Sequence, residues 1–259
     1  MTVVFVSIMV AKLDSRYIRT RPYKAVVRLL SYAFFEGRPL ATKGQWINPL
    51  VLTLFKLQSR LPQLKKVHKP IFIIGSGRSG TTILGTLMSM HKDVGFLNEP
   101  KALWHTIYPE EDLVGTYSRG PARYRLDERN VSHRVRQSAH KIFGSYLAIS
   151  GSRRVVDKSP ELVVRIPFVK TIFEDAKFIF LVRNGWDTCK SIEFRSQHLS
   201  NQVQNSFERH DWWGADNRKW NFLWEQVISQ NLELNRAIPD RAEIEDPLKM
   251  AAIEWIVSM

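Results

Sequence analysis

The sequence predicts an α/β fold of three layers, in which a mostly parallel central sheet lies between helices and follows an N-terminal helical extension. Short apolar runs alternate with longer helical patterns from residue 70 onward, which is typical of β–α–β units. The first of these runs ends in a glycine-rich turn that opens a helix. The 259 residues, 44% apolar and 24% charged, have the composition of a globular protein with a sizeable core.

The N-terminal part, residues 1–66, is predicted to form a helical and basic extension. Arginine and lysine side chains alternate with tyrosine and phenylalanine between residues 16 and 35. Thr2–Ala11 and Asn48–Phe55 are apolar but too short to span a bilayer, which takes about 20 residues, so both are expected to be buried or interfacial. The extension either packs on the rest of the chain or, through residues 1–60, contacts an anionic membrane surface.

The remaining residues, 67–259, are predicted to form a single domain. Its four expected strands are Ile71–Ile74, Val94–Leu97, Arg153–Val156 and Ala176–Val182. Helices are expected up to Met90, over 131–149, over 161–173 and from Trp186, with an inserted helical region across 105–150 and a tryptophan-rich helical end beyond residue 201. Buried parallel strands carry apolar side chains on both faces, and the β-branched run Ile71–Ile74 has that pattern most clearly.

A glycine-rich loop, Gly75–Thr82, follows the first strand with the spacing G-x-x-x-x-G-T-T. Backbone amides in such a loop, together with the N-terminus of the next helix, bind anionic groups. The P-loop of nucleoside triphosphatases has lysine where this chain has Thr81, so the usual contact to a γ-phosphate is missing and the nearest cation is Arg78. The loop therefore predicts an anion site in a P-loop-type fold, with a tight structural turn as the alternative.

A second anion-binding motif follows the last predicted strand. Arg183 stands at the carboxyl end of that strand, where open α/β sheets bind their ligands. Ser191 comes about two turns into the next helix, and a guanidinium and a hydroxyl at this spacing can hold one phosphate. Either residue alone is usually solvated, but the pair after a strand predicts a phosphate site.

The two motifs together resemble the sulfotransferase superfamily, in the Arg-Ser-Gly-Thr-Thr version of bacterial and tyrosylprotein sulfotransferases, over about residues 68–200. The resemblance implies that the sulfate donor 3′-phosphoadenosine 5′-phosphosulfate (PAPS) binds here and that no metal is required. It places the 5′-phosphosulfate at Gly77, Arg78, Ser79, Gly80, Thr81 and Thr82, and the 3′-phosphate at Arg183 and Ser191. It also implies catalytic roles for Glu99, in Asn98-Glu99-Pro100, and for Lys158, in Asp157-Lys158-Ser159-Pro160.

The implied reaction moves SO₃ in line from PAPS to an acceptor oxygen or nitrogen. Charge grows on the bridging oxygen of the leaving phosphate, where Arg78 and Lys158 would stabilise the transition state. Glu99 would accept the acceptor's proton as a general base, a role worth about 10²–10⁴-fold. The simpler alternatives are that Glu99 caps the following helix, that Lys158 pairs with Asp157, or that His91 or His105 is the base.

Three functional classes remain open. The first is a PAPS-dependent sulfotransferase with a small-molecule, carbohydrate or lipid acceptor, in the cytoplasm or peripheral to a membrane; the single Cys189 suits a reducing compartment. The second is a nucleotide kinase or NTPase, for which Val155-Val156-Asp157 is the nearest approach to a Walker-B strand. The third is a non-enzymatic binder of nucleic acid or another anion, based on the net charge of +13, although no nucleic-acid motif is present.

The C-terminal end, Trp255–Met259, lies within a predicted amphipathic helix. Members of the resembled family commonly continue with another strand and a segment that closes over the nucleotide. We therefore expect the C-terminal part to be incomplete and the domain to expose apolar surface, and a chain that binds the donor without turnover is a further alternative. The aromatic and arginine side chains of residues 105–150 are candidates for the acceptor site.

Overall fold

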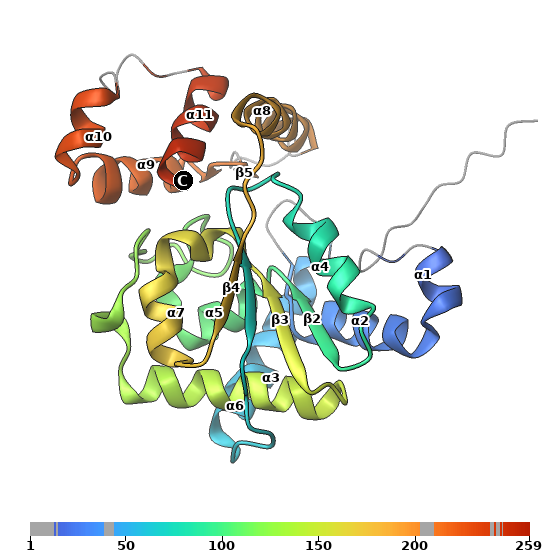
Figure 1. Cartoon of the computed structure of the whole chain (residues 1–259). Coiled ribbons are helices and arrows are strands. Elements are labelled where there is room, and N and C mark those ends of the chain that lie inside the picture. The colour runs from blue at the N-terminus through green and yellow to red at the C-terminus, as the bar shows by residue number, and fades with distance from the viewer. Residues whose placement is uncertain are drawn as a thin grey trace, which may run out of the picture.

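The computed structural model describes residues 13, 15–38, 44–202, 210–238, 241, 244 and 246–259. Its centre is a four-stranded sheet in the order β2-β3-β1-β4, with every neighbouring pair parallel (Figure 1). The strands are β1 (Ile71–Ile74), β2 (Val94–Asn98), β3 (Arg154–Lys158) and β4 (Lys177–Phe180). The predicted α/β architecture is confirmed, and each predicted strand lies within one or two residues of an observed one.

Helices cover both faces of the sheet, which is why its inner strands read as continuous apolar runs. On one face, Phe72, Ile74 and Val155 pack against helices in the largest apolar cluster. The helices of that layer are α3 (Asn48–Arg60), α5 (Lys101–Ile107), α6 (His133–Ile149) and α7 (Ile166–Ile172). On the other face, α4 (Thr81–Ser89) packs on Ile73 and Phe96. Alternate side chains of each strand therefore serve opposite cores.

The N-terminal extension is helical over its described residues, as predicted. It comprises α1 (Ser15–Thr20), α2 (Pro22–Phe34), a short 3₁₀ helix (Gln45–Ile47) and α3. Val51 and Phe55 of α3 are fully buried, whereas Thr2–Ala11 lies outside the described residues. Among the helices that the structure describes, none combines the length and apolar character needed to cross a membrane.

The inserted region 105–150 is less helical than the sequence predicts. After α5 ends at Ile107, only two single-turn 3₁₀ helices (Pro109–Glu111 and Glu128–Asn130) occur before α6. The Asp112 carboxylate accepts backbone N–H groups of the four residues from Gly115 to Ser118, at 2.6–3.1 Å. These bonds satisfy the amides without a helix, so the chain forms a compact loop instead. Similarly, the predicted helix 161–173 begins as a 3₁₀ helix (Pro160–Arg165) before α7.

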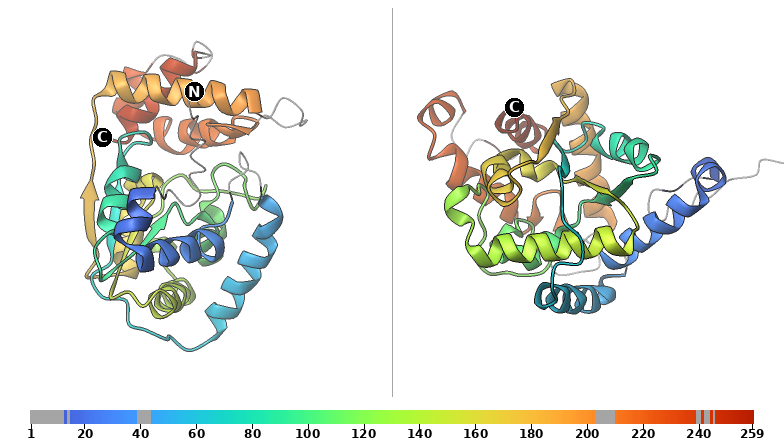
Figure 2. Two further views of the ribbon diagram at one scale, coloured as in Figure 1. Left: turned by 90° about the vertical axis from the view of Figure 1, so that its right-hand side faces the viewer. Right: turned by 60° about the horizontal axis from the view of Figure 1, so that its bottom comes forward.

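The residues after β4 form a second apolar cluster across the carboxyl ends of the strands (Figures 1 and 2). The elements are α8 (Gly185–Gln202), a small hairpin of β5 (His210–Asp211) and β6 (Gly214–Ala215), α9 (Arg218–Leu223), a π-helical turn (Trp224–Ile228), α10 (Leu232–Ala237) and α11 (Pro247–Val257). We call the described part of 210–259 the C-terminal lobe. Figure 2 (left) places this lobe at the opposite end of the molecule from α6.

Several large apolar side chains are exposed on α4, on and just after the edge strand β4, and on α8. They are Ile83, Leu87, Phe180, Val182, Trp186 and Phe194. Ile83 and Trp186 are each about three-quarters exposed.

Candidate active site

A cavity of about 690 Å³ lies at the carboxyl ends of the strands, between the sheet and the C-terminal lobe. Nine of the ten predicted site residues line it: Gly77, Arg78, Gly80, Thr81, Thr82, Glu99, Lys158, Arg183 and Ser191. The tenth, Ser79, is buried in the glycine-rich loop with its hydroxyl unpaired within the described structure. The sequence therefore located one site from four segments that are far apart in the chain.

The glycine-rich loop connects β1 to α4 and leaves the start of the helix open to a ligand. Gly80 precedes α4 in a left-handed conformation and offers no side chain to cap it. The first-turn amides of α4 consequently have no side-chain acceptor from the N-cap, which is the arrangement that binds anions. Gly75 is required at the loop's start, because a Cβ there would lie 2.4 Å from the carbonyl oxygen of Leu181.

The two predicted anion motifs touch each other directly. Arg78, in a left-handed conformation with φ 68°, donates from Nε to the Ser191 hydroxyl at 3.0 Å. Arg183 donates in turn to the Arg78 carbonyl oxygen at 3.2 Å. Burial and the neighbouring Arg78 lower the pKa of Arg195, which also lines the cavity. This end of the cavity thus gathers three guanidinium groups, as a site for a multiply charged anion requires.

Glu99 and Lys158 meet as an ion pair at the ends of the adjacent strands β2 and β3. Lys158 is almost fully buried, whereas the Glu99 side chain is 38% exposed. The Glu99 backbone is left-handed, with φ 51°, and its N–H bonds the Lys158 carbonyl oxygen at 2.8 Å. Burial alone would raise the pKa of Glu99, but the ammonium groups of Lys158 and Lys101 hold it below its ordinary value.

This geometry contradicts the simpler alternatives for these residues. The N-cap of α5 is Pro100 with no side-chain hydrogen bond, so Glu99 does not cap that helix. Lys158 pairs with Glu99, while the buried Asp157 accepts hydrogen bonds from Trp104 and Ser159, each at 2.7 Å. His91 and His105 are not among the residues that line the cavity. Asp157, the Walker-B candidate, does not line it either.

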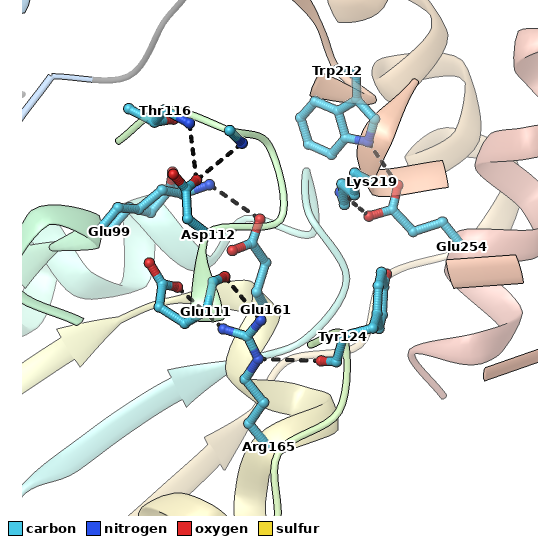
Figure 3. A network of polar contacts seen from close by, with 12 residues as sticks. Glu99, Glu111, Asp112, Thr116, Tyr124, Glu161, Arg165, Trp212, Lys219 and Glu254 are labelled. Atoms are coloured by element: carbon cyan, nitrogen blue, oxygen red, sulfur yellow. Dashed lines mark hydrogen bonds and ion pairs between the residues drawn. The ribbon is translucent and has the colours of Figure 1, made fainter. Parts of the chain in front are cut away.

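Beyond Glu99 the cavity continues into a compartment built of paired charges, which the sequence did not predict (Figure 3). Its three ion pairs are Lys101–Glu161 at 3.1 Å, Arg165–Glu111 at 3.2 Å and Lys219–Glu254. Tyr124 and Trp212 supply aromatic walls. Of the expected lining side chains from residues 105–150, only Tyr124 contributes, because Tyr108, Tyr117, Arg119, Arg123 and Arg125 do not line the cavity.

Two carboxyl groups of this compartment have pKa values that are shifted in opposite directions. Burial would raise the pKa of Glu161, but Lys101, Lys219 and Arg165 hold it at about 2. Burial dominates at Glu111 and raises its pKa, although Arg165 acts in the opposite direction.

The C-terminal lobe contacts both anion motifs through tryptophan side chains. Trp212 lies against Gly77, and its indole N–H donates to Glu254 at 2.6 Å. Trp255 packs on Gly185 and donates to the carbonyl oxygen of Arg183 at 3.3 Å. The lobe thus forms one wall of the cavity.

Comparison with known proteins agrees with these features. A family model described as the sulfotransferase family matches residues 70–240, which span β1 to α10. The chain belongs to the sulfotransferase family. The match covers both anion motifs, Glu99 and Lys158, but leaves out α1, α2 and α3.

Curated relatives of this sulfotransferase-family chain are moderately similar. Protein-tyrosine sulfotransferase 1 of Danio rerio is 28% identical over 63% of this chain and 44% of its own length. Nodulation protein NoeE of Sinorhizobium fredii is 28% identical over 47% of this chain and 30% of its own length. The protein-tyrosine sulfotransferase of Drosophila melanogaster is 26% identical over 82% of this chain and 43% of its own length. The chain thus spans less than half the length of these relatives. No solved structure gives a significant match.

Proposed function

We propose that the chain transfers a sulfuryl group from PAPS to the hydroxyl of a neutral acceptor. The observation that carries this proposal is the direct contact between the two anion motifs, in which Arg78 bridges the glycine-rich loop to Ser191 beside Arg183. PAPS has phosphate groups at two separate positions, and a two-part cationic site suits such a ligand. A nucleoside triphosphate would need the lysine that Thr81 replaces.

In the proposed reaction, the acceptor oxygen forms a bond to sulfur while the bond from sulfur to the bridging oxygen of PAPS breaks. The acceptor's proton passes to Glu99, and the leaving group is 3′-phosphoadenosine 5′-phosphate (PAP). Arg78 and Lys158 stabilise the charge that develops on the departing phosphate oxygen. No step of this reaction calls for a metal ion.

The ion pair between Glu99 and Lys158 gives the reaction an order of events. In the free chain Lys158 keeps Glu99 ionised with a lowered pKa, which makes it a weak base. An anionic donor competes with Glu99 for the Lys158 ammonium, and losing that partner raises the pKa of the carboxylate. Glu99 therefore becomes the stronger base only once the donor has bound.

The compartment of paired charges is the proposed acceptor site. Its three cations are each matched by a carboxylate, so it offers little net attraction to an anionic acceptor. Paired carboxylates retain lone pairs that accept hydrogen bonds from hydroxyl groups. Trp212 and Tyr124 offer apolar contact area. This combination suits a neutral, hydroxyl-bearing acceptor, such as a carbohydrate or a phenol.

Donor binding is tested by calorimetric titration with PAP, with ATP and Mg²⁺ as the comparison. We expect PAP to bind more tightly than ATP, and Arg183→Ala to weaken PAP by about tenfold or more. Arg236→Ala, which removes an exposed arginine of α10, is the matched control and should leave the affinity unchanged. A folded chain that does not bind PAP would refute the proposal.

Turnover is tested with radiolabelled PAPS and a panel of neutral glycosides, phenols and peptides, with and without a chelator. Glu99→Gln should keep the affinity for PAP and lower turnover by about 10²–10⁴-fold. The chelator should have no effect. Near-normal turnover in Glu99→Gln would remove this residue from the role of base.

A further inference from the structure

In the part of the chain that the structure describes, no strand pairs with the outer edge of β2. β2 is the end strand in the order β2-β3-β1-β4, so half of its backbone N–H and C=O groups face away from the sheet. Helix α2 of the N-terminal extension lies along this edge (Figure 1). Unpaired edges are commonly covered by a helix, but here the cover also supplies specific hydrogen bonds.

Three side chains of the extension replace the missing strand. Lys24 donates to the carbonyl oxygen of Val94, and Arg28 donates to that of Phe96 at 3.3 Å. One turn of helix separates Lys24 from Arg28, which places them in register with alternate residues of the strand. Glu36, just after α2, completes the series by accepting the Asn98 N–H at 2.7 Å.

Glu36 is held in place by a buried ion pair. Its carboxylate receives both terminal nitrogens of Arg28, one of them at 2.8 Å, and both side chains are at most 5% exposed. Burying two charges costs several kcal/mol per ion before their attraction is counted. The ion pair holds the Glu36 carboxylate in one position. Its additional hydrogen bond from the Asn98 N–H therefore fixes the strand backbone at Asn98.

That point is immediately next to the proposed base. Asn98 is the last residue of β2, and Glu99 follows it in a left-handed conformation that non-glycine residues seldom adopt. The Asn98 N–H is bonded outward to Glu36, and the Glu99 N–H is bonded inward to the Lys158 carbonyl oxygen at 2.8 Å. The backbone is thus anchored on both sides where the Glu99 side chain leaves the sheet.

We propose that Glu36, supported by Arg28, is a positioning residue that holds Glu99 against Lys158. The inference rests on the proposed role of Glu99 and extends it to residues 22–38, which lie outside the matched region 70–240. Arg28, Glu36 and Arg38 also line the cavity, so the N-terminal extension forms part of the site.

The test compares two double variants that differ by one hydrogen bond. Arg28→Met/Glu36→Gln removes both charges but keeps an oxygen that can accept the Asn98 N–H. Arg28→Met/Glu36→Leu removes that oxygen as well, with a side chain of similar size. Neither variant leaves a buried charge unpaired, so both are expected to fold. Arg19→Met, an exposed change in α1, is the control.

Two measurements on the full chain separate positioning from general stability. The first is the carboxyl pKa of Glu99, followed by carbon NMR and assigned with Glu99→Gln. We expect the leucine variant to raise this pKa by about one pH unit above that of the glutamine variant, because Glu99 moves away from Lys158. The second is PAP affinity, which should agree within about twofold between the two double variants because both remove the same two charges; Arg19→Met should bind PAP like the unaltered chain.

Equal Glu99 pKa values in the two double variants would overturn the inference. If the leucine variant does not fold, Glu36→Asp takes its place, since it keeps both charges and only shortens the reach to Asn98; an unchanged Glu99 pKa there would also overturn it. A chain in which Glu99 titrates as expected but PAP does not bind would refute the proposed function and leave the positioning role intact.

Discussion

A methyl group on Gly77 should weaken PAP binding about tenfold, because the glycine-rich loop already touches the C-terminal lobe at this residue. A Cβ built on Gly77 lies 2.7 Å from two ring carbons of Trp212. Non-bonded carbon atoms prefer separations of about 3.5–4.0 Å, so either the loop or the indole has to move by about 1 Å.

The contacts of Trp212 decide which of the two moves. The indole N–H is bonded to Glu254 at 2.6 Å, and the Lys219 ammonium lies 4.8 Å from the ring centroid while pairing with the same carboxylate. Breaking a hydrogen bond to a charged group costs about 1.5–3 kcal/mol. The loop leads into α4, whose N-terminus has no side-chain cap, so the loop is the softer side. Displacing the loop to relieve overpacking of this kind costs about 1–3 kcal/mol. A loss of about 1.4 kcal/mol in the binding free energy of PAP corresponds to a tenfold higher Kd.

A double-mutant cycle measured by PAP calorimetry tests this reasoning. Gly77→Ala should raise the Kd for PAP about tenfold, and adding Trp212→Ala should return it to within about threefold of the Trp212→Ala value, because the clash is gone. Urea denaturation of each variant separates this effect from a loss of stability. Additive effects of the two substitutions, or unchanged PAP affinity in Gly77→Ala, would refute the contact as the cause.

Three further predictions follow from the site. Ser191→Ala should weaken PAP by about three- to tenfold, since Arg78 loses its bridge to α8; calorimetry that finds no change would contradict this. Glu161→Gln leaves Lys101 without its carboxylate partner and should lower the KM of an acidic acceptor relative to its neutral analogue by up to about tenfold. In competition assays, the same preference as the unaltered chain would count against the proposed acceptor site. Burial raises the pKa of Asp157 to about 7, well above its unfolded value of about 3.9, so the folded chain retains a proton that the unfolded chain loses. The contribution of Asp157 to the free energy of unfolding is therefore greatest at low pH and falls between about pH 4 and 7. Urea denaturation across this range should show a smaller change of unfolding free energy with pH in Asp157→Asn. An equal change in both proteins would contradict the raised pKa.

The strands and the anion motifs could be predicted because each is encoded locally. Ile71–Ile74 is buried on both faces, and two-sided burial produces an unbroken apolar run that is visible in the sequence. The glycine-rich loop and Arg183 directly follow such runs, and the carboxyl ends of parallel strands meet at one edge. The separate roles of Glu99 and Lys158 came from the resemblance, and their pairing was not predicted. The two residues are 59 positions apart, and strand order is not readable from spacing.

The acceptor compartment and the N-terminal contacts could not be predicted because they depend on tertiary pairing. Lys219 and Glu254 are 35 residues apart, and Glu36 and Asn98 are 62 residues apart. Each of these polar residues has the sequence context of an ordinary surface position. The helix expected across 105–150 failed for a related reason: the Asp112 carboxylate satisfies four backbone amides, which a pattern of apolar spacing does not reveal.

The cavity also explains why the net charge of +13 could not identify a ligand. A cation influences a ligand according to its own partner: Lys101, Arg165 and Lys219 are each neutralised by a nearby carboxylate, so they shape the acceptor compartment without making it cationic. At the proposed donor end, Arg78 donates to a hydroxyl, while Arg183 donates to a carbonyl oxygen and lies 3.7 Å from the exposed carboxylate of Asp187. This long, solvent-exposed pairing leaves both guanidinium groups available to an anion. The same residue types therefore create an anionic-ligand site at one end of the cavity and a nearly neutral site at the other. This division suits the proposed sulfuryl transfer, in which the donor carries the charge and a neutral hydroxyl approaches the sulfur as the nucleophile.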